Sequence, residues 1–255
     1  MHHLLAFNGT LAIGAAYSQV AGVPDGAIPR NAAGDYIIPA NMRVLAHHII
    51  GVSTSKGQIQ APSLRIIAYP ELVPINYGVR TAVPDMDRVQ TYGNNGPRVL
   101  MNETIGLYAT NDGVGVSATS GALWVQDRFD PSPDGMTIPI VATVTITVVD
   151  GQWALGSLAF DTQLGAGQYI VTGMDVVGIN ALYARLVFPG NTGMRPGVAV
   201  NQINTRVVLR DPFRLGRIGS FGAFQFNVPP QLEIFGNAAG STPFRVTLDV
   251  IKISG

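Results

Sequence analysis

A cluster of arginines is the most distinctive group of side chains in this sequence that could bind a partner. Four of them fall within twelve residues, interleaved with large apolar side chains: Arg206, Arg210, Arg214 and Arg217. Arginine binds carboxylates and phosphates through a planar, bidentate fork, and arginine mixed with apolar residues is typical of protein interfaces. We therefore predict that this stretch contacts an anionic partner or a neighbouring subunit. A solvated loop in which Asp211 pairs with one of the arginines is the alternative.

Histidine and cysteine patterns argue against metal binding and nucleophilic catalysis. The chain has no cysteine, and its four histidines are His2, His3, His47 and His48. Adjacent residues of a strand point to opposite faces, so His47 and His48 cannot share a metal ion if their segment is extended. We expect one of these two to be buried and the other exposed. Ser157 lies in an incomplete nucleophile motif that lacks its last glycine, so a serine hydrolase is not expected.

Acidic residues form no convincing catalytic pair. Sugar hydrolysis needs two carboxyl groups facing one cleft, and the three glutamates are Glu71, Glu103 and Glu233. Glu103 precedes a predicted strand, where a solvated strand-end acid is the simpler interpretation. The loop from Asp127 to Asp134 could bind calcium, but its prolines favour a turn and its spacing differs from an EF-hand loop. We therefore expect a protein that is not an enzyme and has no catalytic residue, metal site or cofactor.

Composition indicates a surface that is covered by other chains. The net charge is zero, and only 13% of the 255 residues are charged, against about 25% in an average globular domain. Fourteen of the sixteen cationic residues are arginine, a preference that fits interfaces but also fits a GC-rich genome. Zero net charge argues against nucleic-acid binding as the main activity. No run of 18 apolar residues occurs, so no membrane-spanning helix is expected.

The elements that would position these side chains are strands. The clearest is Met136 to Trp153, in which three threonines alternate with a set of apolar residues: Ile138, Ile140, Val144, Ile146 and Val148. Such alternation predicts a strand with an apolar face and a threonine face. A Pro/Gly/Asp-rich break precedes it, and Asp150-Gly151 follows it as a turn signal.

Strand signals continue to the end of the chain. About eight strands separated by Gly, Pro and Asn turns follow residue 136, and the spacing is typical of an antiparallel sandwich, in particular a jelly roll. The first half holds enough strand signals for a second sandwich, with an extended N-terminal segment before it. Residues 35–53 favour a strand, with a short helix as alternative, and residues 63–75 favour an edge strand or an extended connection. We predict an all-β fold with little helix and two sandwiches in tandem: residues 1–135, an N-terminal arm and first sandwich, and residues 136–255, a second sandwich.

Several segments of the second half carry a family resemblance. They are Leu158–Phe160, Gly165–Met174, Ala181–Gly190, Arg195–Gly197 and Phe244–Ile253. In these segments the sequence resembles the jelly-roll major capsid proteins of tailless icosahedral viruses, the double-jelly-roll lineage. The resemblance implies two jelly rolls per chain, standing upright in a shell as trimers with a pseudo-hexagonal outline, and many such shells enclose a membrane. A single-sandwich coat protein with an N-terminal extension is the alternative.

From this resemblance we expect a self-assembling structural protein located in the virion, as part of the capsid. The expected partners are further copies of the chain in a trimeric homo-oligomer, with other virion proteins, an internal membrane or the genome as further candidates, and no small-molecule substrate. A carbohydrate-binding or adhesin-like sandwich is the alternative function, because exposed aromatic side chains can serve as sugar platforms. The candidate platforms are Tyr92, Tyr108, Trp124 and Trp153.

Overall fold

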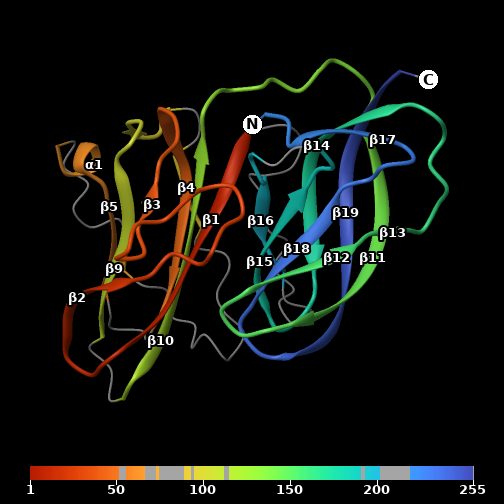
Figure 1. Ribbon diagram of the computed structural model, residues 1–255. Helices are drawn as coiled ribbons and strands as arrows, with labels where there is room; N and C mark the ends of the chain where they lie inside the picture. The colour runs from red at the N-terminus through yellow and green to blue at the C-terminus, as the bar shows by residue number, and fades with distance from the viewer. Residues whose placement is uncertain are drawn as a thin grey trace. The chain divides into compact units, whose positions relative to one another are not determined.

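The chain divides into two units, each built from two β-sheets, in the computed structural model shown in Figure 1. The structure describes residues 1–51, 56–66, 73–74, 89–92, 95–111, 115–190, 193–201 and 219–254. The N-terminal unit comprises residues 5–127, and the C-terminal unit comprises residues 1–4 and 128–255. The sequence placed the boundary after Gly135 and kept the first residues with the N-terminal half. The contacts instead divide the chain before Arg128 and assign Met1–Leu4 to the C-terminal unit.

The N-terminal unit has one sheet of order β1-β10-β4-β7, with β8 also paired to β4, and a second of order β2-β9-β5-β6, with β3 also paired to β9. The strands are β1 (His2–Leu11), β2 (Ala15–Val20), β3 (Tyr36–Ile37), β4 (Met42–Ile50), β5 (Lys56–Gln60), β6 (Val73–Pro74), β7 (Gln90–Thr91), β8 (Arg98–Val99), β9 (Thr104–Asn111) and β10 (Ser117–Gln126). A short helix, α1 (Pro62–Ile66), follows β5. Buried residues of both sheets, among them Tyr36 and Trp124, form the core.

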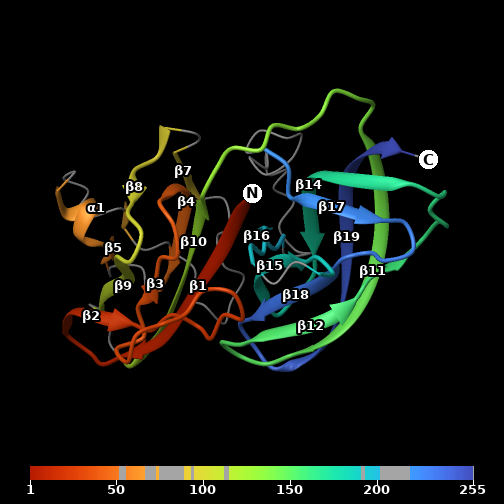
Figure 2. The same cartoon turned by 45° about the horizontal axis from the view of Figure 1, so that its top comes forward.

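The C-terminal unit has sheets of order β13-β11-β19-β14-β17 and β12-β18-β15-β16. Their bounds are β11 (Ile138–Val148), β12 (Trp153–Ser157), β13 (Ala159–Phe160), β14 (Gln168–Val177), β15 (Ala181–Val187), β16 (Gly197–Ala199), β17 (Gly222–Gln225), β18 (Gln231–Gly236) and β19 (Gly240–Ser254). Figure 2 shows β11, β19, β14 and β17 in one sheet, with β12, β18, β15 and β16 in the other.

Both units share one strand order. If the short strands β3, β8 and β13 are set aside, each unit has eight strands among the described residues, and numbering them along the chain gives sheets of order 1-8-3-6 and 2-7-4-5. This arrangement, in which consecutive strands mostly alternate between the two sheets, is that of a jelly roll. The prediction of an all-β fold with two sandwiches in tandem is therefore confirmed. No repeat is visible in the sequence, so the duplication appears only in the strand pairing.

Strand β11 has the two faces that its sequence predicts. Its even-numbered residues from Ile140 to Val148 are buried, and Thr143, Thr145 and Thr147 are exposed. Ile138, at the start of the predicted apolar face, is instead 38% exposed. It pairs with β19 along its whole length, from Ile138 opposite Val250 to Val148 opposite Gly240. Its other edge pairs with β13 only at Ala142 and Thr143 among the described residues. β11 is therefore a long strand near the edge of its sheet, with one apolar and one hydroxyl-bearing face.

Two local predictions are corrected or decided in the N-terminal unit. Residues 42–50 form strand β4, so the helical alternative there is wrong. Residues 62–66 form helix α1, where an edge strand or an extended connection was predicted, while Val73–Pro74 form the edge strand β6 as predicted. Pro62 explains the difference, because proline has a backbone φ already suited to the first turn of a helix and lacks the N–H that would have no partner there.

Candidate functional site

The predicted arginine contact lies outside the part of the chain that the structure describes. Arg206, Arg210, Arg214 and Arg217 all fall within residues 202–218. Their role as an interface or anionic contact therefore stays a prediction.

A charged cluster inside the C-terminal unit was not predicted. Arg185 on β15 lies opposite Glu233 on β18, and its side chain is fully buried. Its Nε donates to Glu233 Oε2 at 2.5 Å, and Arg195 Nη1 donates to the Oε1 and Oε2 atoms of Glu233 at 2.8 and 3.0 Å. The guanidinium carbon of Arg185 also lies 3.9 Å from the centre of the Trp153 ring. Both oxygens of Glu233 are therefore bound by guanidinium groups, which makes this glutamate the counter-ion of two arginines.

The first residues of the chain bind to this cluster. Arg185 Nη1 donates to the Leu4 carbonyl at 3.1 Å, and Leu4 N donates to the Arg195 carbonyl at 3.0 Å. Arg195 N donates to His3 Nδ1 at 2.9 Å. These hydrogen bonds explain why Met1–Leu4 belongs to the C-terminal unit although β1 continues into the N-terminal one.

All four histidines are buried, which corrects the expectation for the internal pair. His47 and His48 are each 1% exposed, and residues 44–50 of β4 are buried on both faces of the strand. The His47 ring stacks on Tyr92 at 5.6 Å, and burial lowers the pKa of His47 to about 3. His2 is likewise buried, with its ring edge-on to Phe221, and burial lowers its pKa to about 3. At neutral pH these two histidines are uncharged packing residues.

The remaining candidate residues have structural contacts. Glu103 Oε2 accepts hydrogen bonds from Ser63 Oγ at 2.5 Å and from Leu100 N at 2.9 Å, so it fixes a turn. Ser157 Oγ lies 3.4 Å from Gln231 Nε2. Glu71 lies outside the described residues. Within the described ranges, no group of three or more His, Cys, Asp or Glu residues is arranged to hold a metal ion, and this includes the loop from Asp127 to Asp134.

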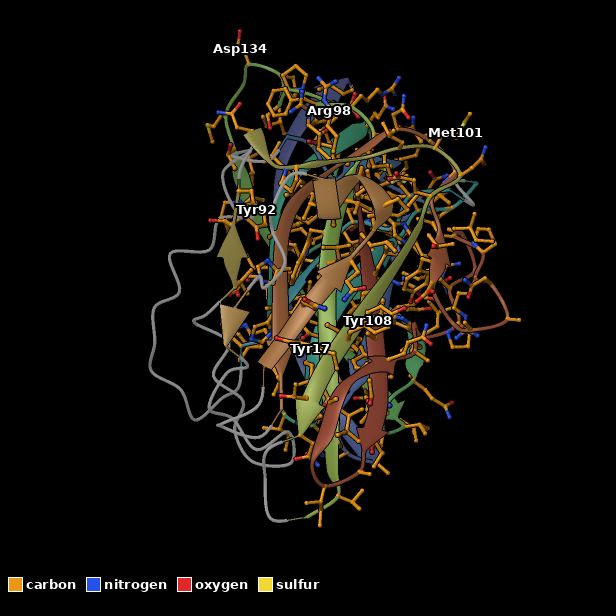
Figure 3. All side chains as sticks on the ribbon, turned by 90° about the vertical axis from the view of Figure 1, so that its left-hand side faces the viewer. Tyr17, Tyr92, Arg98, Met101, Tyr108 and Asp134 are labelled. Carbon is orange, nitrogen blue, oxygen red and sulfur yellow. The ribbon has the colours of Figure 1, made fainter. Side chains whose placement is uncertain are left out.

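Of the four predicted aromatic platforms, one lines a hollow. Trp124 is fully buried, Trp153 covers Arg185, and Tyr92 stacks on His47. Tyr108 instead lies half-buried on the outward face of β9, on the side of the N-terminal unit seen in Figure 3. It borders a hollow of about 190 Å³ that is open to solvent.

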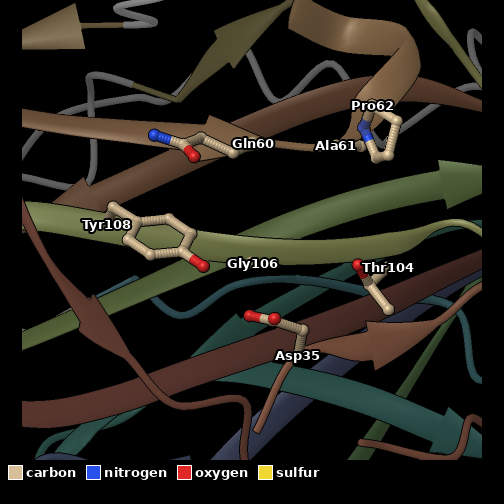
Figure 4. A pocket seen from close by; sticks show the side chains of 7 residues that line it. All are labelled: Asp35, Gln60, Ala61, Pro62, Thr104, Gly106 and Tyr108. Atoms are coloured by element: carbon tan, nitrogen blue, oxygen red, sulfur yellow. The ribbon is translucent and has the colours of Figure 1, made fainter. Parts of the chain in front are cut away.

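The hollow is built on three strands of one sheet. Thr104, Gly106 and Tyr108 are alternate residues of β9 and share its outward face, while Ile105 and Leu107 point into the core. Gln60 on β5 lies opposite Gly106, and β3 pairs with β9 at Thr104, which places Asp35 beside the same face. Figure 4 shows these side chains around the hollow, which Ala61 and Pro62 close at the end of β5. The hollow thus combines an aromatic ring, a carboxylate, an amide and two hydroxyl groups.

In comparisons with known proteins, no protein-family model, no curated protein and no solved structure gives a significant match to the chain. A search of the described residues finds no helix that is both long and apolar enough to cross a membrane.

Proposed function

We propose that the chain is a structural shell protein, a viral major capsid protein that assembles as trimers. The observation that carries this proposal is the jelly-roll strand order repeated in both units. Jelly rolls are a common architecture of viral capsid proteins, and the sequence resembles the lineage that carries two of them per chain. Fold alone does not determine function, so the surface must also suit assembly.

The outward face of β11 supports assembly between copies. Thr143, Thr145 and Thr147 lie opposite Arg245, Pro243 and Ser241 of β19, and all six are exposed. Of these six residues, Arg245 alone carries a charge. Neutral hydroxyl groups cost less free energy to bury than charged groups, provided that they find hydrogen-bond partners. Such a face can pack against a neighbouring subunit at low desolvation cost.

Low overall charge supports the same proposal. A monomer with 13% charged residues has few groups that keep its surface hydrated. Large apolar side chains are also exposed on the C-terminal unit, with Met136 at 79% and Leu155 at 52% exposure. Subunit contacts in a shell would cover such groups. The function is mechanical: the chain encloses the virion contents, and no side chain reacts.

The mass of the purified chain in solution tests the proposal. Light scattering coupled to size-exclusion chromatography at micromolar concentration should give at least three times the 26.9 kDa chain mass. Electron microscopy of the same material, or of material concentrated at low salt, should show closed or sheet-like arrays with a repeating three-fold unit. A monodisperse monomer that forms no array under any of these conditions would contradict the proposal.

A further inference from the structure

We propose that the hollow on the outward face of β9 is a binding site for a single sugar residue. The site lies wholly within the N-terminal unit and is lined by Asp35, Gln60, Thr104, Gly106 and Tyr108. It holds its ligand without converting it. The proposal does not depend on assembly into a shell.

Glycine at position 106 creates the space. A Cβ atom on Gly106 would overlap the Oδ1 atom of Asp35 and would lie 3.1 Å from Tyr108 Cε2. The carboxylate of Asp35 therefore sits above the strand where any other residue would place a side chain. Glycine occupies strands at a cost in backbone entropy and often marks a close approach of another group or a ligand. Here it brings the carboxylate and the tyrosine ring to opposite sides of one depression.

Asp35 is held in place by neutral donors. Gln19 Nε2 donates to its Oδ1 at 2.5 Å, and Asn31 Nδ2 donates to its Oδ2 at 3.3 Å. Asn31 Oδ1 in turn accepts the Asp35 backbone N–H at 2.9 Å. No cationic side chain forms an ion pair with Asp35 in the described part of the chain. Each carboxylate oxygen has more than one acceptor position, so both can accept further hydrogen bonds from a ligand.

The polar groups match a ligand that donates and accepts hydrogen bonds. Asp35 only accepts, whereas the Thr104 and Tyr108 hydroxyls and the Gln60 amide can do both. Sugar hydroxyl groups are donors and acceptors at once, and a carboxylate can bind two adjacent ones. The Tyr108 ring offers an apolar surface for the C–H face of the sugar. A hollow of about 190 Å³ has room for one such ring, part of which stays in solvent.

Two other ligand classes fit less well. Calcium takes 6–8 oxygen ligands and is usually bound by several carboxylates, and this hollow has only one. An alkylammonium ion can only donate hydrogen bonds and would use the acceptor atoms of the hollow alone, whereas a sugar hydroxyl both donates and accepts. The mixed donor and acceptor set favours the neutral polyhydroxy ligand.

A hollow that holds one sugar ring and leaves part of it in solvent should bind that sugar weakly. If the chain also forms a shell, many copies of the hollow would be displayed together, and multivalency would raise the avidity for a glycan-coated surface by orders of magnitude. That consequence rests on the proposed function, whereas the binding of one sugar residue to one chain does not.

A glycan array probed with the intact, labelled chain tests the proposal, followed by saturation-transfer NMR with the monosaccharide of each positive glycan. At least one terminal sugar should bind with millimolar to high-micromolar affinity. Gly106→Ala places a methyl group where Asp35 lies and should lower the affinity at least tenfold. Asp35→Asn, which keeps the shape of the side chain, and Tyr108→Phe, which keeps the ring, should each weaken binding at least threefold.

Matched variants separate the hollow from the rest of the surface. Tyr17→Phe removes the hydroxyl of another exposed tyrosine in the same unit, and Asp161→Asn changes an exposed aspartate of the C-terminal unit; both should bind like the unchanged chain. Circular dichroism and thermal unfolding establish that each variant folds. If Gly106→Ala does not fold, Asp35→Asn and Tyr108→Phe still decide the matter.

Several outcomes would overturn the proposal. The first is an array without positive glycans, and the second is sugar binding that survives both Gly106→Ala and Asp35→Asn. The third is that the chain binds no sugar but binds calcium chloride or n-butylamine saturably, and that the Asp35→Asn variant loses this binding. Light scattering on Gly106→Ala should give the same oligomer as the unchanged chain. Loss of sugar binding with assembly intact would separate this site from the shell function, and a monomeric chain that still binds sugar would refute the shell function alone.

Discussion

Arg185 and Glu233 face each other across the β15–β18 pair, and their side chains meet inside the C-terminal jelly roll, 2.5 Å apart. The fully buried guanidinium also lies against the Trp153 ring and donates to the Leu4 carbonyl. One carboxylate thus neutralises a buried cation and helps to fix the start of the chain.

Removing the negative charge of this cluster should be costly. Glu233→Gln leaves two guanidinium groups close together without their counter-ion, and breaking a buried ion pair typically costs about 3–5 kcal/mol. Urea unfolding should show a loss of this order. Arg245→Met, which removes an exposed arginine of β19, should change the free energy of unfolding by less than about 0.5 kcal/mol. Equal stability of the two variants would contradict a structural role for the cluster.

Acid should destabilise the N-terminal unit through His47. The pKa of His47 is 6.5 in a solvated chain and about 3 in the fold, where burial disfavours the charged ring. Below pH 6.5 the unfolded chain therefore binds a proton that the folded unit does not, and stability falls as the pH drops from 6.5 towards 3. This single group should contribute a loss of about 2 kcal/mol between pH 7.5 and pH 5.

The variant His47→Gln should lose less stability over that pH range, since glutamine does not titrate. Urea unfolding in a Trp153→Phe background makes Trp124 the sole tryptophan, and it reports on the N-terminal unit. Carboxylates titrate equally in both proteins, so the difference between them isolates His47. The same pH dependence with and without His47 would show that its ring is solvated.

Gly156 should be essential for the contact between the two sheets of the C-terminal unit. A Cβ atom at this position would lie 2.6 Å from side-chain atoms of Val144 and Ile146 on β11. Because both neighbours are buried, Gly156→Ala should cost about 1–3 kcal/mol through overpacking. Gly165→Ala, where the nearest atom would be 3.8 Å away, serves as the control in the same denaturation experiment. Comparable stabilities would mean that the sheets separate easily at β12.

The threonine face of β11 should be sensitive to charge if it contacts another copy. Thr145→Lys places an ammonium group on an exposed face, which opposes edge-to-edge and face-to-face association. The Thr145→Lys variant should have a lower oligomer mass by light scattering. The midpoint temperature of its thermal unfolding as an isolated chain should change little. Thr145→Ser keeps the hydroxyl group and should assemble normally. Undiminished assembly of Thr145→Lys would place the subunit contact elsewhere.

Much of the strand content follows from the local sequence. Alternation with period two located β11, β14, β15 and β19, because side chains of a strand point to opposite faces in turn. The same pattern predicted that the threonines of β11 share the face opposite its apolar residues. Burial of both His47 and His48 could not be predicted in this way, because it depends on what covers each face of β4 and not on the residues of β4 itself.

The sequence by itself thus determined the all-β class and the two faces of β11, and it left two sandwiches and a single sandwich with an N-terminal extension as alternatives. The strand pairing of the tertiary structure decided for two. Only the tertiary structure decided which strands pair, as when β11 meets β19 about a hundred residues later and both units adopt one strand order. It also decided which polar groups meet: Asp35 lies above Gly106, and Glu233 lies between Arg185 and Arg195. Strand periodicity is a property of neighbouring residues, whereas these meetings depend on pairing between distant segments, which local spacing does not encode.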